Sequence, residues 1–260
     1  MTKLMNPKYP EGRNLFKDQN ILLTAAAGAG IGFATAKRFL EEGSNIFISD
    51  MNEGRLNQAM DKLKKLGLGE VDGCICNVTN DSEINDMFTA AINKFGSIHS
   101  VINNAGLGGE SKLEDMTNDD WNLVMDVTLN GAMKIMRAAI PVLKNTQGTI
   151  VNNASVLGWR AQSGQSHYAA AKAGVMALTR CVALETVEDG IRINAVAPSL
   201  AINPHLVKTS SDELINSLSS KEAFGRGAEP WEVANVILFL ASDLSSYMTG
   251  EVISVSSQQA

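Results

Sequence analysis

Cysteine is scarce in this sequence, which contains only Cys74, Cys76 and Cys181 among its 260 residues. Cys74 and Cys76 alternate along a segment typical of a strand, so their side chains would point to the same face. No second cluster of cysteine or histidine accompanies them. A disulfide framework or a metal site needs such a set. We therefore predict no metal and no disulfide, and interpret the thiols as packing groups.

An excess of positive charge is also lacking, since 22 lysines and arginines face 28 aspartates and glutamates, for a net charge of −6. This balance excludes non-specific nucleic-acid binding, which requires a cationic surface. A small anionic ligand needs only a local basic pocket and is not excluded. No run approaches 18 apolar residues, and the N-terminal stretch M-T-K-L-M-N-P-K-Y-P-E-G-R has no apolar segment typical of a signal peptide. We expect no membrane partner and a cytoplasmic protein.

Apolar residues make up 45% of the chain, enough for a large core. Residues 1–18 are polar and are predicted to form a surface arm. From residue 19 to 260, predicted strands alternate with predicted helices, which indicates one α/β domain with a doubly wound parallel sheet. Strands are predicted at 20–24, 45–50, 71–76, 98–103, 148–153, 190–197 and 251–255. Helices are predicted at 31–42, 81–95, 117–144, 165–187, 211–219 and 229–240. A further polar helix is predicted to follow the second strand and to end at Leu66.

A glycine-rich loop, T-A-A-A-G-A-G-I-G at 24–32, lies between the first predicted strand and the first helix. Glycines at Gly28, Gly30 and Gly32 would let the backbone approach a pyrophosphate, and the helix N-terminus offers free N–H groups. A tight turn that needs glycine only for steric reasons is the alternative. Asp50, at the end of the second strand, favours a dinucleotide because its carboxylate would accept hydrogen bonds from the adenosine ribose.

Asp50 also predicts which dinucleotide binds. A 2′-phosphate about 4 Å from this carboxylate would be repelled by several kcal/mol at an effective dielectric constant near 20. Met-Asn-Glu follows Asp50, so no lysine or arginine stands next to it to compensate. The sequence predicts NAD(H) rather than NADP(H).

Three residues later in the chain are candidates for chemistry. Tyr168 and Lys172 are four residues apart, so on a helix they lie on one face. An ammonium beside a phenol favours the phenolate, and we expect Lys172 to lower the pKa of Tyr168. Ser155 precedes Tyr168 by thirteen residues and ends the segment G-T-I-V-N-N-A-S. By itself, Y-x-x-x-K more often indicates only a helix with one exposed lysine.

With the glycine loop, Asp50, N-N-A-G at 103–106 and S-x12-Y-x3-K in this order, residues 18–258 resemble the short-chain dehydrogenase/reductase family. The resemblance implies a single Rossmann domain with a seven-stranded sheet. It also implies that Ser155 polarises the substrate oxygen, Tyr168 exchanges a proton, and Lys172 binds the nicotinamide ribose. Residues 199–222 would form a lid over the substrate, and the subunits would form a homotetramer.

The dinucleotide contacts implied by the resemblance come from strand ends and the loops that follow them. They are Thr24, Ala26, Gly28, Gly30, Ile31, Gly32, Asp50, Met51, Asn77, Val78, Asn104, Ala105, Gly106, Tyr168, Lys172, Pro198 and Leu200.

Several positions depart from the family pattern. The glycine loop has one residue more than the usual T-G-x-x-x-G-x-G, and Asn77 replaces an aspartate. Thr128 stands where the family has the helix asparagine of its catalytic tetrad, so a threonine hydroxyl or a water would replace that asparagine in proton transfer. Ser199 and Asn203 replace the glycine and the threonine that usually follow the proline.

The A-A-A-G-x-G-I-G loop, Thr128, A-P-S-L-A and the ending T-G-E-V-I-S-V-S-S resemble bacterial reductases of steroid ring C/D degradation. Such enzymes act on a hydroxyl or ketone of an indane-type acyl-CoA. Arg160, Lys208 and Arg226 are candidates for contacts to the CoA anions, whereas His167, about 100° of helix from Tyr168, is expected to pack or face solvent. A 3-oxoacyl-(acyl carrier protein) reductase and a non-catalytic dinucleotide-binding protein are the alternatives.

Overall fold

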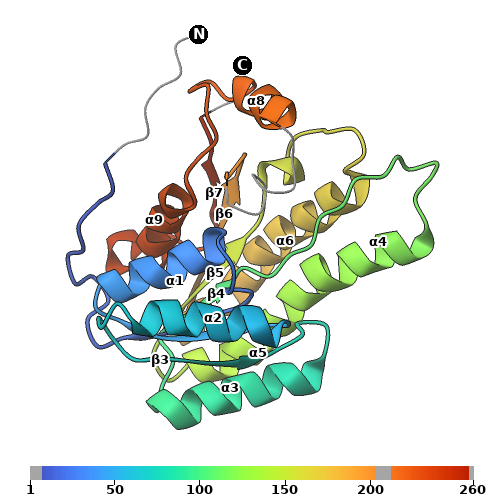
Figure 1. Ribbon diagram of the computed structural model, residues 1–260. Coiled ribbons are helices and arrows are strands. Elements are labelled where there is room, and N and C mark those ends of the chain that lie inside the picture. Colours follow the sequence, from blue (N-terminus) through green and yellow to red (C-terminus); the bar gives the residue numbers. More distant parts are fainter. Residues whose placement is uncertain (1–7, 203–211, 258–260) are drawn as a thin grey trace.

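Seven parallel strands form the central sheet in the computed structural model, which describes residues 8–202 and 212–257. Their order is β3-β2-β1-β4-β5-β6-β7 (Figure 1). The strands are β1 (Asn20–Leu23), β2 (Asn45–Asp50), β3 (Val71–Ile75), β4 (Ser100–Asn103), β5 (Thr149–Asn153), β6 (Arg192–Pro198) and β7 (Val252–Val255). The predicted doubly wound parallel sheet is confirmed. Every residue of β1 and β4 is buried, because helices cover both faces of the sheet.

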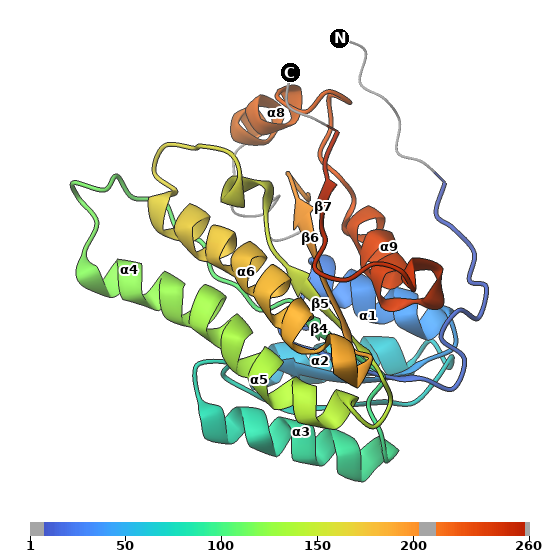
Figure 2. The same ribbon diagram turned by 180° about the vertical axis from the view of Figure 1, so that it is seen from behind.

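The helices form a layer on each face of the sheet. Their bounds are α1 (Ile31–Glu41), α2 (Glu53–Lys64), α3 (Asp81–Phe95), α4 (Asn118–Met125), α5 (Gly131–Leu143), α6 (Ser166–Glu185), α8 (Asp212–Ser220) and α9 (Pro230–Ala241). One apolar cluster joins the sheet to α1, α2 and α9, and a second joins it to α3, α5 and α6. Figure 2, seen from behind, shows α3, α5 and α6 in front of the sheet. No helix of the described residues has the length and apolar character needed to span a membrane.

The predicted helix at 117–144 is interrupted in the structure. A π-helical turn, η1 (Asp126–Asn130), separates α4 from α5, and Pro141 lies within the last turn of α5. A π turn widens the helix by one residue, and single π turns are common at functional sites. The apolar spacing along this segment fits an ordinary helix, so the sequence carried no signal for the wider turn. Short 3₁₀ turns occur at η2 (Val156–Gly158), η3 (Val187–Asp189) and η4 (Asp243–Ser245).

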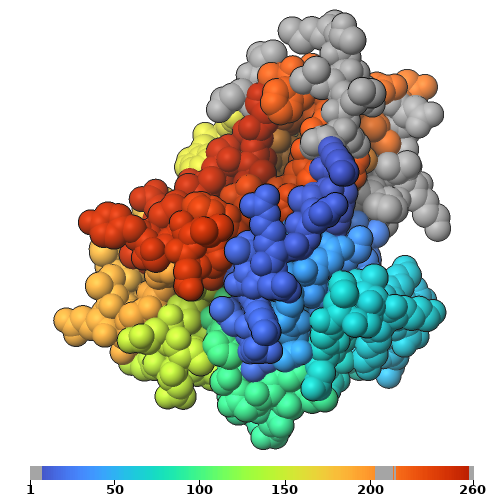
Figure 3. All heavy atoms as spheres, turned by 90° about the vertical axis from the view of Figure 1, so that its left-hand side faces the viewer, coloured from blue at the N-terminus to red at the C-terminus, as the bar shows by residue number. Residues whose placement is uncertain are grey.

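The N-terminal arm is more firmly attached than predicted. Phe16 is fully buried and its ring meets that of Phe39 of α1 edge-on, with centroids 4.7 Å apart. The Tyr9 hydroxyl donates a 2.7 Å hydrogen bond to Glu41. Figure 3 shows the arm, in dark blue, lying across the surface between α1 and the C-terminal part of the chain, in red. Phe16 belongs to the main core, so the end of the arm packs against the domain.

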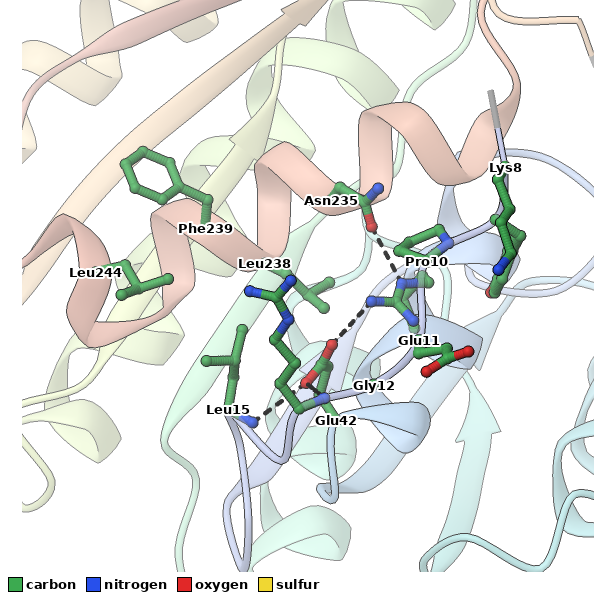
Figure 4. A pocket seen from close by; sticks show the side chains of 13 residues that line it. Lys8, Pro10, Glu11, Gly12, Leu15, Glu42, Asn235, Leu238, Phe239 and Leu244 are labelled. Atoms are coloured by element: carbon green, nitrogen blue, oxygen red, sulfur yellow. Dashed lines mark hydrogen bonds and ion pairs between the residues drawn. The ribbon is translucent and has the colours of Figure 1, made fainter. Parts of the chain in front are cut away.

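A buried ionic cluster holds this arm against α1 and α9. Arg38 is 3% exposed and binds Glu41 and Glu42 at 2.7 and 2.8 Å, and its Nε donates to Asn235. Glu42 also accepts the backbone N–H of Arg13 at 2.7 Å. A cavity of about 610 Å³ lies between the arm and α9, and Leu238 is one of the residues that line it (Figure 4). It adjoins the C-terminal end of α1 and therefore lies at the amino edge of the parallel sheet.

Candidate active site

The residues predicted to bind a dinucleotide gather at the carboxyl edge of the sheet. Thr24 follows β1, Asp50 ends β2, Asn77 follows β3, Asn104 follows β4 and Pro198 ends β6. β1 pairs with β2 on one side and β4 on the other, so the strand order reverses at β1. In open α/β sheets, ligands bind outside the carboxyl edge at such a switch point. The cavity beside the arm lies at the opposite edge and is not this site.

The glycine loop has the backbone geometry of an anion cradle. Gly28 has φ +107°, a conformation that side chains with a Cβ rarely adopt. A Cβ on Gly32 would come within 2.6 Å of the Ala25 carbonyl and of Asn104, so only glycine fits there. Open space surrounds Gly28 and Gly30. Gly30 caps α1, and no side chain caps this helix, so the N–H groups of its first turn are left for a ligand. These features fit a pyrophosphate.

Ala25 stands where the family usually has glycine, and its φ of 49° lies in the left-handed region. The loop therefore keeps the conformation for which glycine is favoured, at a cost of about 1–2 kcal/mol. Thr24 holds the loop to the next strand, because its Oγ1 accepts the N–H of Asn104 and of Ala105 at 3.0 and 3.1 Å. Asn104 Nδ2 donates in return to the carbonyls of Thr24 and Ala25. The N-N-A-G segment therefore fastens β4 to the loop after β1.

Asp50 has a basic partner that was not expected from the sequence. Asp50 Oδ1 forms an ion pair with Arg55 at 2.8 Å. The same oxygen accepts a hydrogen bond from the N–H of Asn52 at 2.9 Å. Asn52 caps α2, and this turn brings the side chain of Arg55 back to the end of β2. The expectation that no basic residue compensates the carboxylate is therefore wrong. An arginine three residues after an N-cap is the signal in the sequence that could have indicated it.

Asn77 and Val78 have mainly local contacts. Asn77 Oδ1 accepts from the N–H and hydroxyl of Thr79 at 3.1 and 3.0 Å. Val78 is 6% exposed, and a Cβ on Gly131 would meet it at 2.8 Å. Met51, in contrast, is 69% exposed at the rim of this edge.

The structure brings Ser155, Tyr168 and Lys172 together. Ser155 follows β5 and caps η2, and its hydroxyl is hydrogen-bonded to the Tyr168 hydroxyl. Tyr168 and Lys172 lie on α6, with Lys172 Nζ 5.6 Å from the centroid of the phenol ring. Lys172 is 3% exposed and donates a 2.5 Å hydrogen bond to the Asn153 carbonyl. The sequence did not predict that Asn153 binds Lys172, because the acceptor is a backbone carbonyl, which every residue type has.

The expected lowering of the Tyr168 pKa is wrong in this structure. Burial raises the pKa of Tyr168, and the hydrogen bond with Ser155 opposes this only in part. Lys172 does not counter the burial because its ammonium is directed to the Asn153 carbonyl instead of the phenol oxygen. Burial also lowers the pKa of Lys172 to about 8. The phenol is therefore protonated at neutral pH.

Thr128 lies in the π turn η1 and is fully buried. Its hydroxyl donates to the Leu107 carbonyl and accepts the Leu107 N–H, both at 2.9 Å. The Thr128 hydroxyl therefore uses its donor in a hydrogen bond to the backbone just after the N-N-A-G segment. The part of Thr128 in proton transfer stays a prediction.

The segment predicted to be a lid is only partly described. Asn203 and Lys208 lie outside the described residues. Arg226 is not a free cation for a CoA phosphate, because its guanidinium binds both carboxylate oxygens of Glu232 at 2.6 and 2.9 Å. Arg160 is half-buried and follows the 3₁₀ turn η2. His167 is 2% exposed, as expected for a packing residue.

Comparison with known proteins agrees with this architecture. A family model described as enoyl-(acyl carrier protein) reductase matches residues 25–257. The chain is 53% identical, over 97% of both sequences, to (5R,7aS)-5-hydroxy-7a-methyl-1-oxo-2,3,5,6,7,7a-hexahydro-1H-indene-carboxyl-CoA reductase of Mycobacterium tuberculosis. It is 37% identical to a 3-oxoacyl-[acyl-carrier-protein] reductase of Thermotoga maritima, over 90% of this chain and 95% of the relative.

Among solved structures, a short chain dehydrogenase from Mycobacterium smegmatis superposes with a TM-score of 0.87 at 52% identity. The match covers 98% of this chain and 99% of that one. Fold, nucleotide loop and sequence relatives thus agree on an oxidoreductase that binds a nicotinamide dinucleotide. The chain belongs to the short-chain dehydrogenase/reductase family.

Proposed function

We propose that the protein is an NAD-dependent oxidoreductase that interconverts a secondary alcohol and a ketone on a steroid-derived, indane-type acyl-CoA. The observation that carries this proposal is the 53% identity, over 97% of both chains, to a reductase named for a hydroxy-indene-carboxyl-CoA. A 3-oxoacyl thioester reductase is the second candidate, favoured by the 37% identity to the Thermotoga maritima enzyme.

NAD(H)-coupled turnover separates these candidates when it is measured across bicyclic indane-type acyl-CoAs, straight-chain 3-oxoacyl-CoAs and free sterols. The proposal expects turnover of the bicyclic thioesters alone. Activity confined to straight-chain thioesters would replace it with the second candidate. Binding of the dinucleotide without turnover of any compound would indicate a non-catalytic protein.

The bound nicotinamide would accept or give the hydride. Ser155 would hold the substrate oxygen, since its hydroxyl already meets that of Tyr168. A phenol whose pKa is raised keeps its proton at neutral pH, which suits Tyr168 as the acid in ketone reduction. Lys172, fixed by the Asn153 carbonyl, would orient the ribose side of the site.

Cofactor preference gives a direct prediction about Asp50 and Arg55. We expect the enzyme to prefer NADH, and Arg55→Gln to widen this preference about tenfold, because the carboxylate would repel a 2′-phosphate without its 2.8 Å ion pair. Asp50→Ala should shift the preference towards NADPH. The measurement is kcat/KM for both cofactors, and Lys62→Gln on the far end of α2 is the control. A wild-type preference for NADPH would contradict the assignment of NAD.

We also propose a cytoplasmic homotetramer in which α4, α5 and α6 meet their counterparts. Apolar side chains are exposed on these helices, with Leu123 54% and Leu184 78% exposed. A cavity of about 380 Å³ between α5 and α6 is lined by Met133 and Ile140. Light scattering of the purified protein measures the state directly.

A further inference from the structure

Glu222 is a buried carboxylate that the proposed reaction does not use. It is 6% exposed and follows α8, the helix that stands above the ends of β6 and β7 in Figure 1. Among the described residues it forms no ion pair, although a buried carboxylate is costly unless donors satisfy it. Its neighbour Arg226 is committed to Glu232. The donors that satisfy Glu222 are therefore informative.

Those donors come from two separate parts of the chain. Oε2 accepts the Ser199 hydroxyl at 3.1 Å and the Ser257 hydroxyl at 3.0 Å. Oε1 accepts the Leu200 N–H at 3.4 Å. Ser199 and Leu200 directly follow Pro198, and Ser257 lies beyond β7. We name these four residues, Ser199, Leu200, Glu222 and Ser257, the Glu222 cluster.

The cluster fixes the chain as it leaves β6. On one side, Leu200 and Ile202 are held by Ala228, through bonds of 2.8 and 3.0 Å. On the other side, the bonds among the described residues come from Glu222 and from the Ser199 N–H, which donates to the Val255 carbonyl at 3.1 Å. A cavity of about 150 Å³ borders the carboxylate, so apolar packing does not replace its hydrogen bonds. Glu222 is therefore the side chain that links Ser199 and Leu200 to the segment beyond β7.

We propose that Glu222 is a positioning residue for the dinucleotide: it holds Ser199 and Leu200, and hence Pro198, against the nicotinamide end of the site and ties them to the C-terminal strand. This inference rests on the proposed function, in which Pro198 and Leu200 contact the cofactor. A carboxylate with donors from both segments makes nucleotide affinity depend on Ser257, which lies outside the site.

The test measures the NADH dissociation constant by fluorescence titration, together with KM, kcat and thermal stability. Glu222→Ala should raise the dissociation constant and KM for NADH about tenfold, with kcat changed less than about threefold. Ser257→Ala should have a smaller effect in the same direction. It should add nothing in the Glu222→Ala background, because both remove the same link. Glu222→Gln, which keeps one acceptor oxygen, should recover part of the affinity.

Glu42→Gln is the matched control, since Glu42 is a buried carboxylate with backbone donors at the opposite edge of the sheet. It should lower thermal stability and leave NADH affinity unchanged. The inference is overturned if Glu222→Ala binds NADH like the wild type, or if Glu42→Gln loses as much affinity. Trypsin tests the bond between Ser257 and Glu222 in the absence of nucleotide. Cleavage after Lys221 should be faster in Ser257→Ala than in the wild type. Unchanged cleavage overturns the link, whereas failure of wild-type NADH binding overturns the proposed function.

Discussion

Replacing Tyr168 by Phe should lower kcat about a thousandfold, within the usual range for loss of a positioned proton donor, and leave NADH binding nearly intact. The change removes one hydroxyl, which is hydrogen-bonded to Ser155, and keeps the ring that packs against Lys172. Steady-state kinetics and a fluorescence titration measure the two effects separately.

Tyr247→Phe is the control for this experiment, because Tyr247 is fully exposed after η4 and contacts nothing at the carboxyl edge. Its kinetics should match those of the wild type. Retention of full turnover by the Tyr168→Phe protein would remove Tyr168 from the proposed chemistry and with it the part of Ser155.

Replacing Lys172 by Met should lower kcat about a hundredfold and yet make the protein more stable at pH 7. Burial lowers the pKa of this lysine from 10.5 to about 8, which corresponds to about 3 kcal/mol of destabilisation at neutral pH, in part offset by its bond to Asn153. Between pH 8 and 10.5 the unfolded chain binds the extra proton, so wild-type stability rises with pH through this window. The advantage of the variant should therefore shrink from pH 7 to pH 10.5.

Chemical unfolding of both proteins at pH 7 and pH 10 measures this difference, and the comparison cancels the other titrating groups. Lys134→Met serves as the control, because Lys134 is 21% exposed and paired with Asp81 at 2.8 Å. It should change neither kcat nor the difference in stability between pH 7 and pH 10. A Lys172→Met protein that is several kcal/mol less stable than the wild type at pH 7 would contradict the prediction.

The fold was predictable because its signals are local and repeated. Strands such as β1 and β4 are buried on both faces and appear as apolar runs, and α2 and α3 begin at Asn52 and Asn80, whose side chains cap them. The meeting of Ser155 with Tyr168 was predictable only through the family resemblance, since thirteen residues separate them. Each is carried by its own element, and the sheet brings the two together.

What could not be predicted depends on the directions of side chains and on backbone acceptors. The ammonium of Lys172 donates to the Asn153 carbonyl, and burial, the largest cause, raises the pKa of Tyr168. Arg55 returns to Asp50 only because the first turn of α2 aims it there. Glu222 finds its partners across 35 residues of sequence, in a region without periodic pattern.

The missing cap of α1 has a consequence for protein engineering. Gly30 occupies the position at which a serine or aspartate would stabilise a helix by about 1 kcal/mol, and routine design of more heat-resistant variants would choose that replacement. The new side-chain oxygen would take the N–H groups that the loop leaves open, and an aspartate would also place a negative charge there. A thermostabilised variant made in this way would compete with its own cofactor, so residue 30 should be kept fixed in any such library.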